Sequence, residues 1–382
     1  MVLDACGVGA LPDAVDYGDP ADADTLVHLA EAVGGLDLPV LASLGLGNIR
    51  TMQGVPPVAT PALHGRLHPF GPGKESTTGH WELMGVVPPV PLPTYSKGFP
   101  PEVVTALEEA TGLRFCCNRP ASGTVVLEEF GEHHLRTREA ILYTSADSVL
   151  QIAAHVDVLS EPELYRACEA AREVMQGEHA VGRVIARPFE GRPSAFRRTE
   201  GRHDYSLVPP SRSYLQELQD AGIAVHAVGK VRDLFAGVGI DEAHPGATNA
   251  RAIFSMTELL RDLDSGFVFA NLVETDQLYG HRKDVEGFHG ALRAIDAAVA
   301  SWLELMRPGD LLVLTADHGL DPEAPHTDHT REHAPLLAVF EDSDGHRHDG
   351  PLADVGASVL AWLTGRDAPE LPGTSFLESR GA

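Results

Sequence analysis

Residues 311–319 read LLVLTADHG, and this stretch decides the fold class. Its apolar half, 311–314, predicts a short buried strand, which Asp317 and His318 follow almost at once. Layered α/β folds place their chemistry at the carboxyl ends of such strands, and Gly319 lets the backbone turn there. The two side chains can then face one ion, although an Asp-His pair after a strand is also common in ordinary turns.

The second half of the chain alternates short β-rich runs with helical patterns, which is typical of an α/β fold with a mostly parallel central sheet between helices. Strands are expected at 267–273, 311–315 and 336–340. Between the first two, apolar residues recur at steps of three and four and predict one helix: Phe288, Leu292, Ile295, Val299, Trp302 and Met306. We expect this stripe to be core rather than a cofactor site.

Proline and glycine cluster at 87–101 and again around Pro209 and Pro210, and such clusters end regular elements. They predict the two linkers of an inserted small α/β domain, with a catalytic core at 1–93 and 210–382 and a substrate-binding cap at 94–209. Within the cap, helices are expected at 102–111 and 161–175, and strands at 124–127 and 140–143. Two separate domains fit the length equally well.

The amino-acid composition limits the classes of molecule that this chain is expected to bind. The 382 residues carry a net charge of −26, from 55 acidic and 29 basic residues, which disfavours nucleic acid and anionic membranes as partners. No apolar run of about 18 residues is present, so a soluble cytoplasmic protein is expected. The four cysteines, Cys6, Cys116, Cys117 and Cys168, form neither a spaced metal pattern nor a disulfide framework. Small molecules are the expected ligands.

Two further stretches repeat the pattern of a strand followed by an acid. Asp276 and His281 follow the strand expected to end at 273, and Asp4 follows the short apolar start of the chain. A third ligand could come from the loop after Asp317, which carries His326, Asp328, His329 and His333. Oxygen and imidazole donors without thiolate suit Mn²⁺, Mg²⁺ or Zn²⁺.

Residues 73–82, GKESTTGHWE, place hydroxyls at the expected start of a helix. The unpaired N–H groups and the dipole of a helix start favour an anion, although most such Ser/Thr runs are only N-caps. A basic patch follows later, because six arginines fall between 183 and 202: Arg183, Arg187, Arg192, Arg197, Arg198 and Arg202. Guanidinium groups suit phosphate oxygens, and about half of these are expected only to keep the surface soluble.

Seven segments in this order resemble the phosphopentomutase family of the alkaline phosphatase superfamily. They read LDACGVGALPDA (3–14), GKESTTGHWELMG (73–85), YTSADSVLQIAAH (143–155), GRVIARPFEG (182–191), VGKVRDLFAGVGI (228–240), NLVETDQLYGHRKDVEG (271–287) and TADHGLDPEAPHTDHTREHAPLL (315–337). The resemblance implies an isomerase, an intramolecular phosphotransferase that interconverts (2-deoxy)ribose 1-phosphate and 5-phosphate. It also implies an alkaline-phosphatase-like core with an inserted cap.

Carried over residue by residue, the resemblance implies two divalent metal ions, with Mn²⁺ expected, and a sugar bisphosphate primer such as glucose 1,6-bisphosphate or ribose 1,5-bisphosphate. It assigns Asp276, His281 and His329 to one metal and Asp4, Asp317 and His318 to the other. Thr78 becomes the phosphorylated residue, and the implied substrate contacts are Ser145, Asp147, Arg183, Ile185, Arg198 and Lys230. Cys6 and Glu274 depart from the family wording, which has serine and aspartate there.

Other functions remain compatible with these residues. A metal-dependent phosphatase or phosphodiesterase would use the same ligands, and a phosphoglycerate mutase of the same superfamily would be expected to use serine as its nucleophile. A non-catalytic metal-binding protein would keep the ligands but have no use for Thr78. The arginine-bearing cap favours transfer of phosphate between positions of a sugar.

Overall fold

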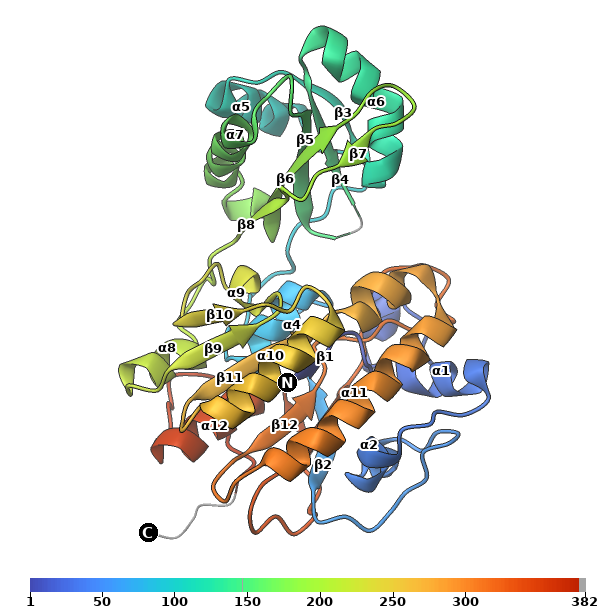
Figure 1. Cartoon of the computed structure of the whole chain (residues 1–382), viewed down its shortest axis with the longest axis vertical. Helices are drawn as coiled ribbons and strands as arrows, with labels where there is room; N and C mark the ends of the chain where they lie inside the picture. Colours follow the sequence, from blue (N-terminus) through green and yellow to red (C-terminus); the bar gives the residue numbers. More distant parts are fainter. Residues whose placement is uncertain (146, 378–382) are drawn as a thin grey trace. The chain divides into compact units, whose positions relative to one another are not determined.

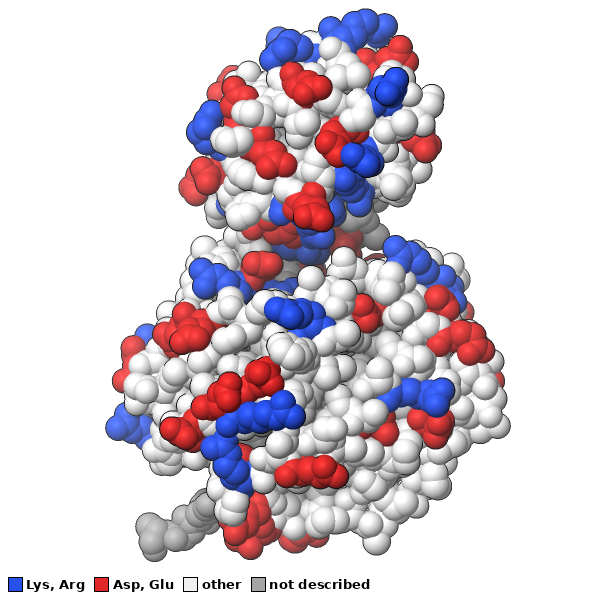
Figure 2. All heavy atoms as spheres, viewed as in Figure 1, with Lys and Arg blue, Asp and Glu red and all other residues white. Residues whose placement is uncertain are grey.

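The computed structural model describes residues 1–145 and 147–377, and the chain divides into two compact units (Figure 1). The core unit comprises residues 1–90 and 209–382, and the inserted unit comprises residues 91–208. The proline-rich segments therefore coincide with the two crossings between units. On the face shown in Figure 2, acidic and basic side chains are interspersed over each unit.

The core unit is built on an eight-stranded sheet with the order β10-β9-β11-β1-β12-β13-β2-β14. The strands are β1 (Val2–Leu3), β2 (Leu63–His68), β9 (Val225–Val228), β10 (Glu242–His244), β11 (Phe267–Leu272), β12 (Leu312–Thr315), β13 (Ala334–Val339) and β14 (Gly350–Pro351). The five strands from β10 to β12 are parallel, and only β13 runs antiparallel to its neighbours. The expected mostly parallel sheet is confirmed.

Helices lie on both faces of this sheet. They are α1 (Thr25–Val33), α2 (Pro39–Ser43), α3 (Leu46–Ile49), α4 (Ser76–Leu83), α8 (Tyr214–Asp220), α9 (Val231–Leu234), α10 (Asn249–Asp262), α11 (Val285–Leu305) and α12 (Asp354–Thr364). Figure 1 shows α10 and α11 crossing one face side by side, while α12 packs against α4 and α8. The expected stripe on α11 is buried from Phe288 to Trp302, and Met306 follows the helix end half-buried.

The inserted unit has its own sheet, with the order β3-β4-β5-β6-β7 and with β8 paired to β6. Its strands are β3 (Phe115–Pro120), β4 (Ala140–Thr144), β5 (Val149–His155), β6 (Arg183–Glu190), β7 (Arg197–Arg198) and β8 (His203–Ser206). Leu142 of β4 packs with α5 (Pro101–Thr111) and α7 (Glu161–Val174), whereas Ile141 and Tyr143 pack with α6 (Gly123–Thr137). Alternate residues of one strand thus serve two separate cores.

The strand expected at 124–127 is wrong, because these residues lie inside α6. The β-branched run TVVL favours a strand by local preference, but Val126 and Leu127 are buried while Val125 is 41% exposed, which is a helical pattern of burial. The other three elements expected in this unit are confirmed as α5, α7 and β4. Among the described residues, no helix is long and apolar enough to cross a membrane.

Two substitutions in α5 should separate burial from helix content. Leu107 is fully buried in the core beneath α5 and α7, so Leu107→Ala is expected to lower the free energy of unfolding by about 2 to 5 kcal/mol. Glu109 is exposed on the same helix, and Glu109→Ala should change it by less than about 0.5 kcal/mol. Urea denaturation followed by circular dichroism measures both, and equal effects would contradict the assigned packing.

Candidate active site

The carboxyl ends of four parallel strands meet at one edge of the core sheet, and each is followed by a charged side chain. Asp4 follows β1, Asp276 follows β11, Asp317 and His318 follow β12, and Lys230 follows β9. Since β1, β9, β11 and β12 are adjacent and parallel, these side chains come together although they are far apart in the sequence.

Asp4, Asp317 and His318 form the first cluster, and their ligand atoms lie within 4.8 Å of one another. His318 Nε2 is 3.5 Å from Asp4 Oδ1 and 3.3 Å from Asp317 Oδ2. The other oxygens are held by the protein, because Asp317 Oδ1 accepts the Ala5 N–H at 3.2 Å and Asp4 Oδ2 accepts from Asn271 at 3.1 Å. All three side chains are buried.

Asp276, His318 and His329 form the second cluster, again with ligand atoms within 4.8 Å. His329 Nε2 lies 3.2 Å from Asp276 Oδ1, and His281 Nε2 lies 3.4 Å from the same oxygen. His281 Nδ1 is 2.7 Å from the Thr327 carbonyl, which requires the proton on Nδ1. The Nε2 lone pair of His281 is therefore left facing Asp276, as a metal ligand requires.

Burial and mutual repulsion set the charge state of the cluster. Burial and the neighbouring Asp317 hold the pKa of Asp4 well above its usual range. Burial alone would raise the pKa of Asp317, but His318, His80 and Lys230 together bring it well below its usual value. Burial lowers the pKa of His318 to about 4, so its imidazole is neutral near pH 7. Neutral imidazole and ionised carboxylate are the forms that bind metals.

The residues present fit a divalent metal. Asp4 Oδ1 is a buried carboxylate oxygen that accepts no hydrogen bond from the described residues. An oxygen of this kind costs free energy unless a cation is bound beside it. The set offers only oxygen and imidazole donors, since the Cys6 thiol is directed at the Asp4 carbonyl 3.7 Å away. Mn²⁺, Mg²⁺ and Zn²⁺ suit these donors.

Ser76 contributes a hydroxyl that contacts the cluster. Ser76 is the first residue of α4, and its Oγ lies 3.1 Å from His318 Nε2 and 2.9 Å from Lys230 Nζ. Thr78 is buried, and its hydroxyl donates instead to the Glu75 carbonyl at 3.1 Å. Two residues further along a helix, a side chain points to a different face, which accounts for the difference.

His80 is a neighbour of the cluster that the sequence reasoning did not single out. Its Nδ1 lies 3.1 Å from Asp317 Oδ2, and its Nε2 lies 3.0 Å from the Asn271 amide that also binds Asp4. The sequence signal that could have identified His80 is its position four residues after Ser76, which places both side chains on the same face of a helix. Close approach of α4 depends on Gly79, where a Cβ would lie 2.4 Å from the Asp317 carbonyl oxygen.

Glu332 was also missed, and it holds the loops beside the cluster. Its carboxylate accepts from the Thr25 N–H at 2.9 Å, the Thr25 hydroxyl at 2.7 Å and the Thr330 hydroxyl at 2.6 Å. Gly7 and Gly319 pack against it so closely that a Cβ at either would lie 2.3 Å from a Glu332 oxygen. Burial raises the pKa of Glu332 to about 7.

The other donors of the loop after Asp317 lie elsewhere. His326 Nε2 is 3.1 Å from Asp19, and Asp328 accepts the backbone N–H of His329 at 2.9 Å. The backbone N–H of His333 donates to the Gly9 carbonyl at 2.8 Å. Of the four donors that composition left open, His329 is the one that these contacts place against Asp276.

The remaining expected substrate residues divide between the units. Lys230 belongs to the core unit, where its ammonium pairs with Asp4. In the inserted unit, Arg183 lies 3.5 Å from Asp204 and 4.0 Å from Asp147. Exposed Arg198, in β7, lies beside the Tyr143 hydroxyl. Ser145 follows β4 half-buried, and Ile185 is buried in β6.

The six arginines do not form one patch. Burial, together with the positive charges of Arg202 and Arg198, lowers the pKa of Arg187 to about 10, which identifies these three as neighbours. Arg197 is exposed and pairs instead with Glu190 at 2.9 Å. Arg192 is also exposed, in the segment between β6 and β7. The subset around Arg187 is the part suited to binding an anion.

Comparisons with known proteins show the family of this chain. Residues 1–365 match the model of the metalloenzyme superfamily. A phosphopentomutase of Dictyoglomus thermophilum is 45% identical over 386 residues, covering 99% of this chain and 97% of that protein. A phosphopentomutase of Anaeromyxobacter sp. (strain K) is 48% identical over 382 residues, with the same coverage of both chains. The chain therefore belongs to the phosphopentomutase family, within the metalloenzyme superfamily.

Proposed function

We propose that this chain interconverts ribose or 2-deoxyribose 1-phosphate and the corresponding 5-phosphate by moving the phosphoryl group through the hydroxyl of Ser76. The observation that carries the proposal is the convergence of Asp4, Asp276, Asp317, His318 and His329 at one sheet edge, with the start of α4 against it. Family membership supplies the class of substrate.

One metal would be held by Asp4, Asp317 and His318, and the other by Asp276, His281 and His329. When bound, such a pair supplies Lewis acidity that lowers the pKa of a nearby alcohol and offsets charge on phosphoryl oxygens. Mn²⁺ is the ion that we expect from the family resemblance. Three carboxylates would leave the loaded site with net positive charge, which favours an arriving phosphate.

Ser76 is the hydroxyl that we assign to phosphate transfer, in place of the Thr78 expected from the family wording. Lys230 donates to the Ser76 oxygen at 2.9 Å, so its positive charge offsets the negative charge that develops there. Ser76 is also the first residue of α4, where the positive end of the helix dipole favours negative charge. The Thr78 hydroxyl instead donates to the Glu75 carbonyl, and it would have to lose this hydrogen bond before it could accept one from Lys230.

The transfer balances as two in-line displacements. In the first, the bond between phosphorus and the Ser76 oxygen breaks as the C1 hydroxyl of a pentose 5-phosphate bonds to phosphorus, and the proton of that hydroxyl passes to the Ser76 oxygen. In the second, the Ser76 hydroxyl bonds to the 5-phosphorus of the resulting 1,5-bisphosphate, the bond between that phosphorus and the C5 oxygen breaks, and the Ser76 proton passes to the C5 oxygen. A sugar bisphosphate would load Ser76 at the start. Exclusion of water from the site would protect both species from hydrolysis.

Arg183 and Arg198 would hold the phosphate that does not react. Both are partly or fully exposed in the inserted unit, and a guanidinium group can donate two hydrogen bonds to one phosphate. Hydrogen bonds of this charged kind contribute about 1.5 to 3 kcal/mol each. The cap would therefore contribute substrate affinity, and the core unit would contribute the transfer itself.

Alanine substitutions of the two candidate hydroxyls distinguish them. Ser76→Ala is expected to lower turnover of ribose 1-phosphate by about 10³-fold or more, because the substitution removes the attacking oxygen itself. Thr78→Ala should retain turnover within about tenfold and lose about 1 kcal/mol of stability with its hydrogen bond to Glu75. Peptide mapping should find the phosphate on Ser76. Phosphate on Thr78, or full activity of Ser76→Ala, would reject the assignment.

Two histidines of one loop give a matched test of the metal ligands. His329→Ala should lower Mn²⁺ affinity by about 100-fold or more and turnover with it, because a direct ligand is lost. His326→Ala should leave both within about twofold, since His326 contacts Asp19 instead. Equilibrium dialysis and turnover after removal of metal with EDTA and titration with Mn²⁺ measure both effects. Equal losses in the two variants would argue against the ligand set.

Two adjacent arginines of β7 test the phosphate contact in the cap. Arg198→Ala is expected to raise KM for ribose 5-phosphate by about tenfold or more with a smaller change in kcat, because it removes a charged hydrogen bond to the non-reacting phosphate. Arg197→Ala should leave KM within about twofold, since Arg197 is exposed and paired with Glu190. An unchanged KM in Arg198→Ala would exclude that contact.

A further inference from the structure

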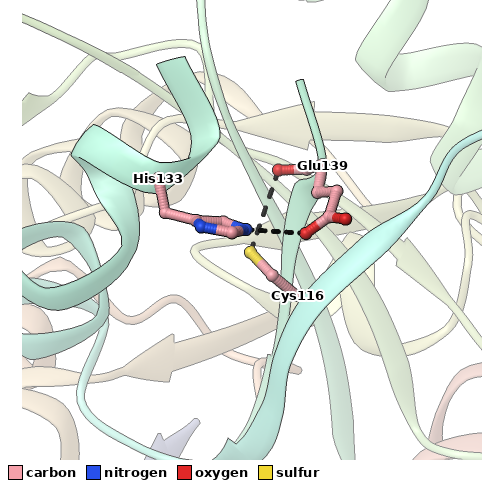
Figure 3. A group of neighbouring side chains, drawn as sticks. All are labelled: Cys116, His133 and Glu139. Carbon is pink, nitrogen blue, oxygen red and sulfur yellow. Dashed lines mark hydrogen bonds and ion pairs between the residues drawn. The ribbon is translucent and has the colours of Figure 1, made fainter. Parts of the chain in front are cut away.

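The inserted unit contains a further group of side chains of the types that bind metals, separate from the two clusters on the core sheet. Cys116 lies in β3, His133 lies in the last turns of α6, and Glu139 follows that helix just before β4. Figure 3 shows the three side chains pointing toward one another. Their sulfur, nitrogen and oxygen ligand atoms all lie within 4.8 Å of one another.

The backbone explains why these three residues converge. In the sheet, Phe115 pairs with Ala140 and Cys116 with Ile141, so Cys116 lies beside the residues that follow Glu139. The left-handed backbone of Arg138 ends α6 and turns the chain back, which puts Glu139 next to His133. A bulge in β3 follows Cys116 directly, between Cys117 and Arg119, and such bulges redirect neighbouring side chains.

The existing contacts leave the thiol without a strong partner. His133 Nε2 and Glu139 Oε2 lie 2.7 Å apart, at hydrogen-bond distance, with side chains 36% and 38% exposed. The Cys116 sulfur is 3.6 Å from the Ala140 carbonyl and 3.8 Å from the Glu139 carbonyl, which are weak thiol hydrogen bonds. The guanidinium of neighbouring Arg138 donates to the Val158 carbonyl at 2.8 Å, so that bond directs it elsewhere.

We propose that Cys116, His133 and Glu139 bind a thiophilic divalent cation, Zn²⁺ by preference, with water as the fourth ligand. Thiolate, imidazole and carboxylate are the three donor types that Zn²⁺ takes in proteins, and four-coordinate geometry is its usual choice. A thiolate and a carboxylate together balance the charge of the ion. Partial exposure of His133 and Glu139 gives the ion a route in from solvent.

The ion would join three segments of the inserted unit: β3, the end of α6 and the connection into β4. Binding requires loss of the thiol proton, which the cation displaces. Because the site lies within the inserted unit, it does not depend on the transfer chemistry proposed for the core. Its role would be to fix the position of α6 on the sheet, and so to stabilise the unit against unfolding.

A thiolate signal separates this site from the other candidate cation sites among the described residues. The expected ligands on the core sheet include no sulfur, and neither does the set of His226, Glu242 and His244 on strands β9 and β10. Co²⁺ bound by a thiolate gives a sulfur-to-metal charge-transfer absorption in the near ultraviolet, which nitrogen and oxygen ligands do not give. The band therefore reports on the thiolate site even while Co²⁺ fills the others.

The test uses the full chain stripped of metal and titrated with Co²⁺. The charge-transfer band should reach its maximum when one Co²⁺ ion per chain is bound at this site. It should disappear when Zn²⁺ is added and displaces the Co²⁺. Cys116→Ser should abolish the band, whereas Cys117→Ser, the matched control at the neighbouring thiol, should retain it. The variant His329→Ala should also retain it, because that residue belongs to the core unit.

His133→Gln provides a second variant on the partly exposed surface of α6, should Cys116→Ser fold poorly by circular dichroism. It is expected to weaken Co²⁺ binding at this site by about tenfold or more while keeping the fold. Absence of a band in the unmodified chain would overturn the proposal. Persistence of the band in Cys116→Ser, or unchanged affinity in His133→Gln, would overturn it as well.

Discussion

Three buried carboxylates at one edge of a sheet are the constraint around which the core unit is organised. Asp4, Asp276 and Asp317 are all less than a tenth exposed, and like charges at this range repel strongly where water is excluded. The protein itself supplies Lys230, whose pKa is raised by Asp4, Asp276 and Asp317 in spite of its burial. One ammonium cannot balance three carboxylates, so the arrangement is suited to cations from solution.

Strands and one helix hold the side chains of this site in position. Each carboxylate stands at the end of a different parallel strand, and strand pairing fixes the distances between them. Asn271 in β11 connects the end of β1 with α4, because its side-chain amide donates to Asp4 and lies 3.0 Å from His80 Nε2. Gly79 brings α4 against β12, so the hydroxyl of Ser76 is delivered by a helix rather than by a loop. Sites built on helices and strands hold their side chains more precisely than sites built on loops.

The sequence is enough to find the carboxylates, because an acid soon after an apolar run is a local signal. That pattern selects Asp4, Asp276 and Asp317, and strand adjacency then brings them together. His80 and Glu332 carry no such signal. Their importance comes from contacts with residues distant in the chain, at the ends of β12 and β11 and on α1, which no local pattern encodes.

The choice between Ser76 and Thr78 shows a different limit. Residues 76–78 read STT, so the sequence offers three hydroxyl groups that could accept a phosphoryl group. Which of them faces the cluster depends on how the helix is rotated about its axis, and in the structure Ser76 contacts His318. That rotation depends on the residue at which the helix begins, and helix boundaries are the least reliable part of a prediction from sequence. The strand expected at 124–127 failed for a related reason, because burial within α6 outweighed the preference of valine for strands.

An acidic chain can nevertheless bind an anionic sugar phosphate, because the two effects act over different distances. The net charge of −26 is spread over the surface, and physiological salt screens it beyond about 8 Å. Within contact distance, local groups decide, and in the core unit these are Lys230 beside Ser76 and the start of α4. Positive charge concentrated in a few buried or half-buried positions therefore outweighs a larger negative charge dispersed in solvent.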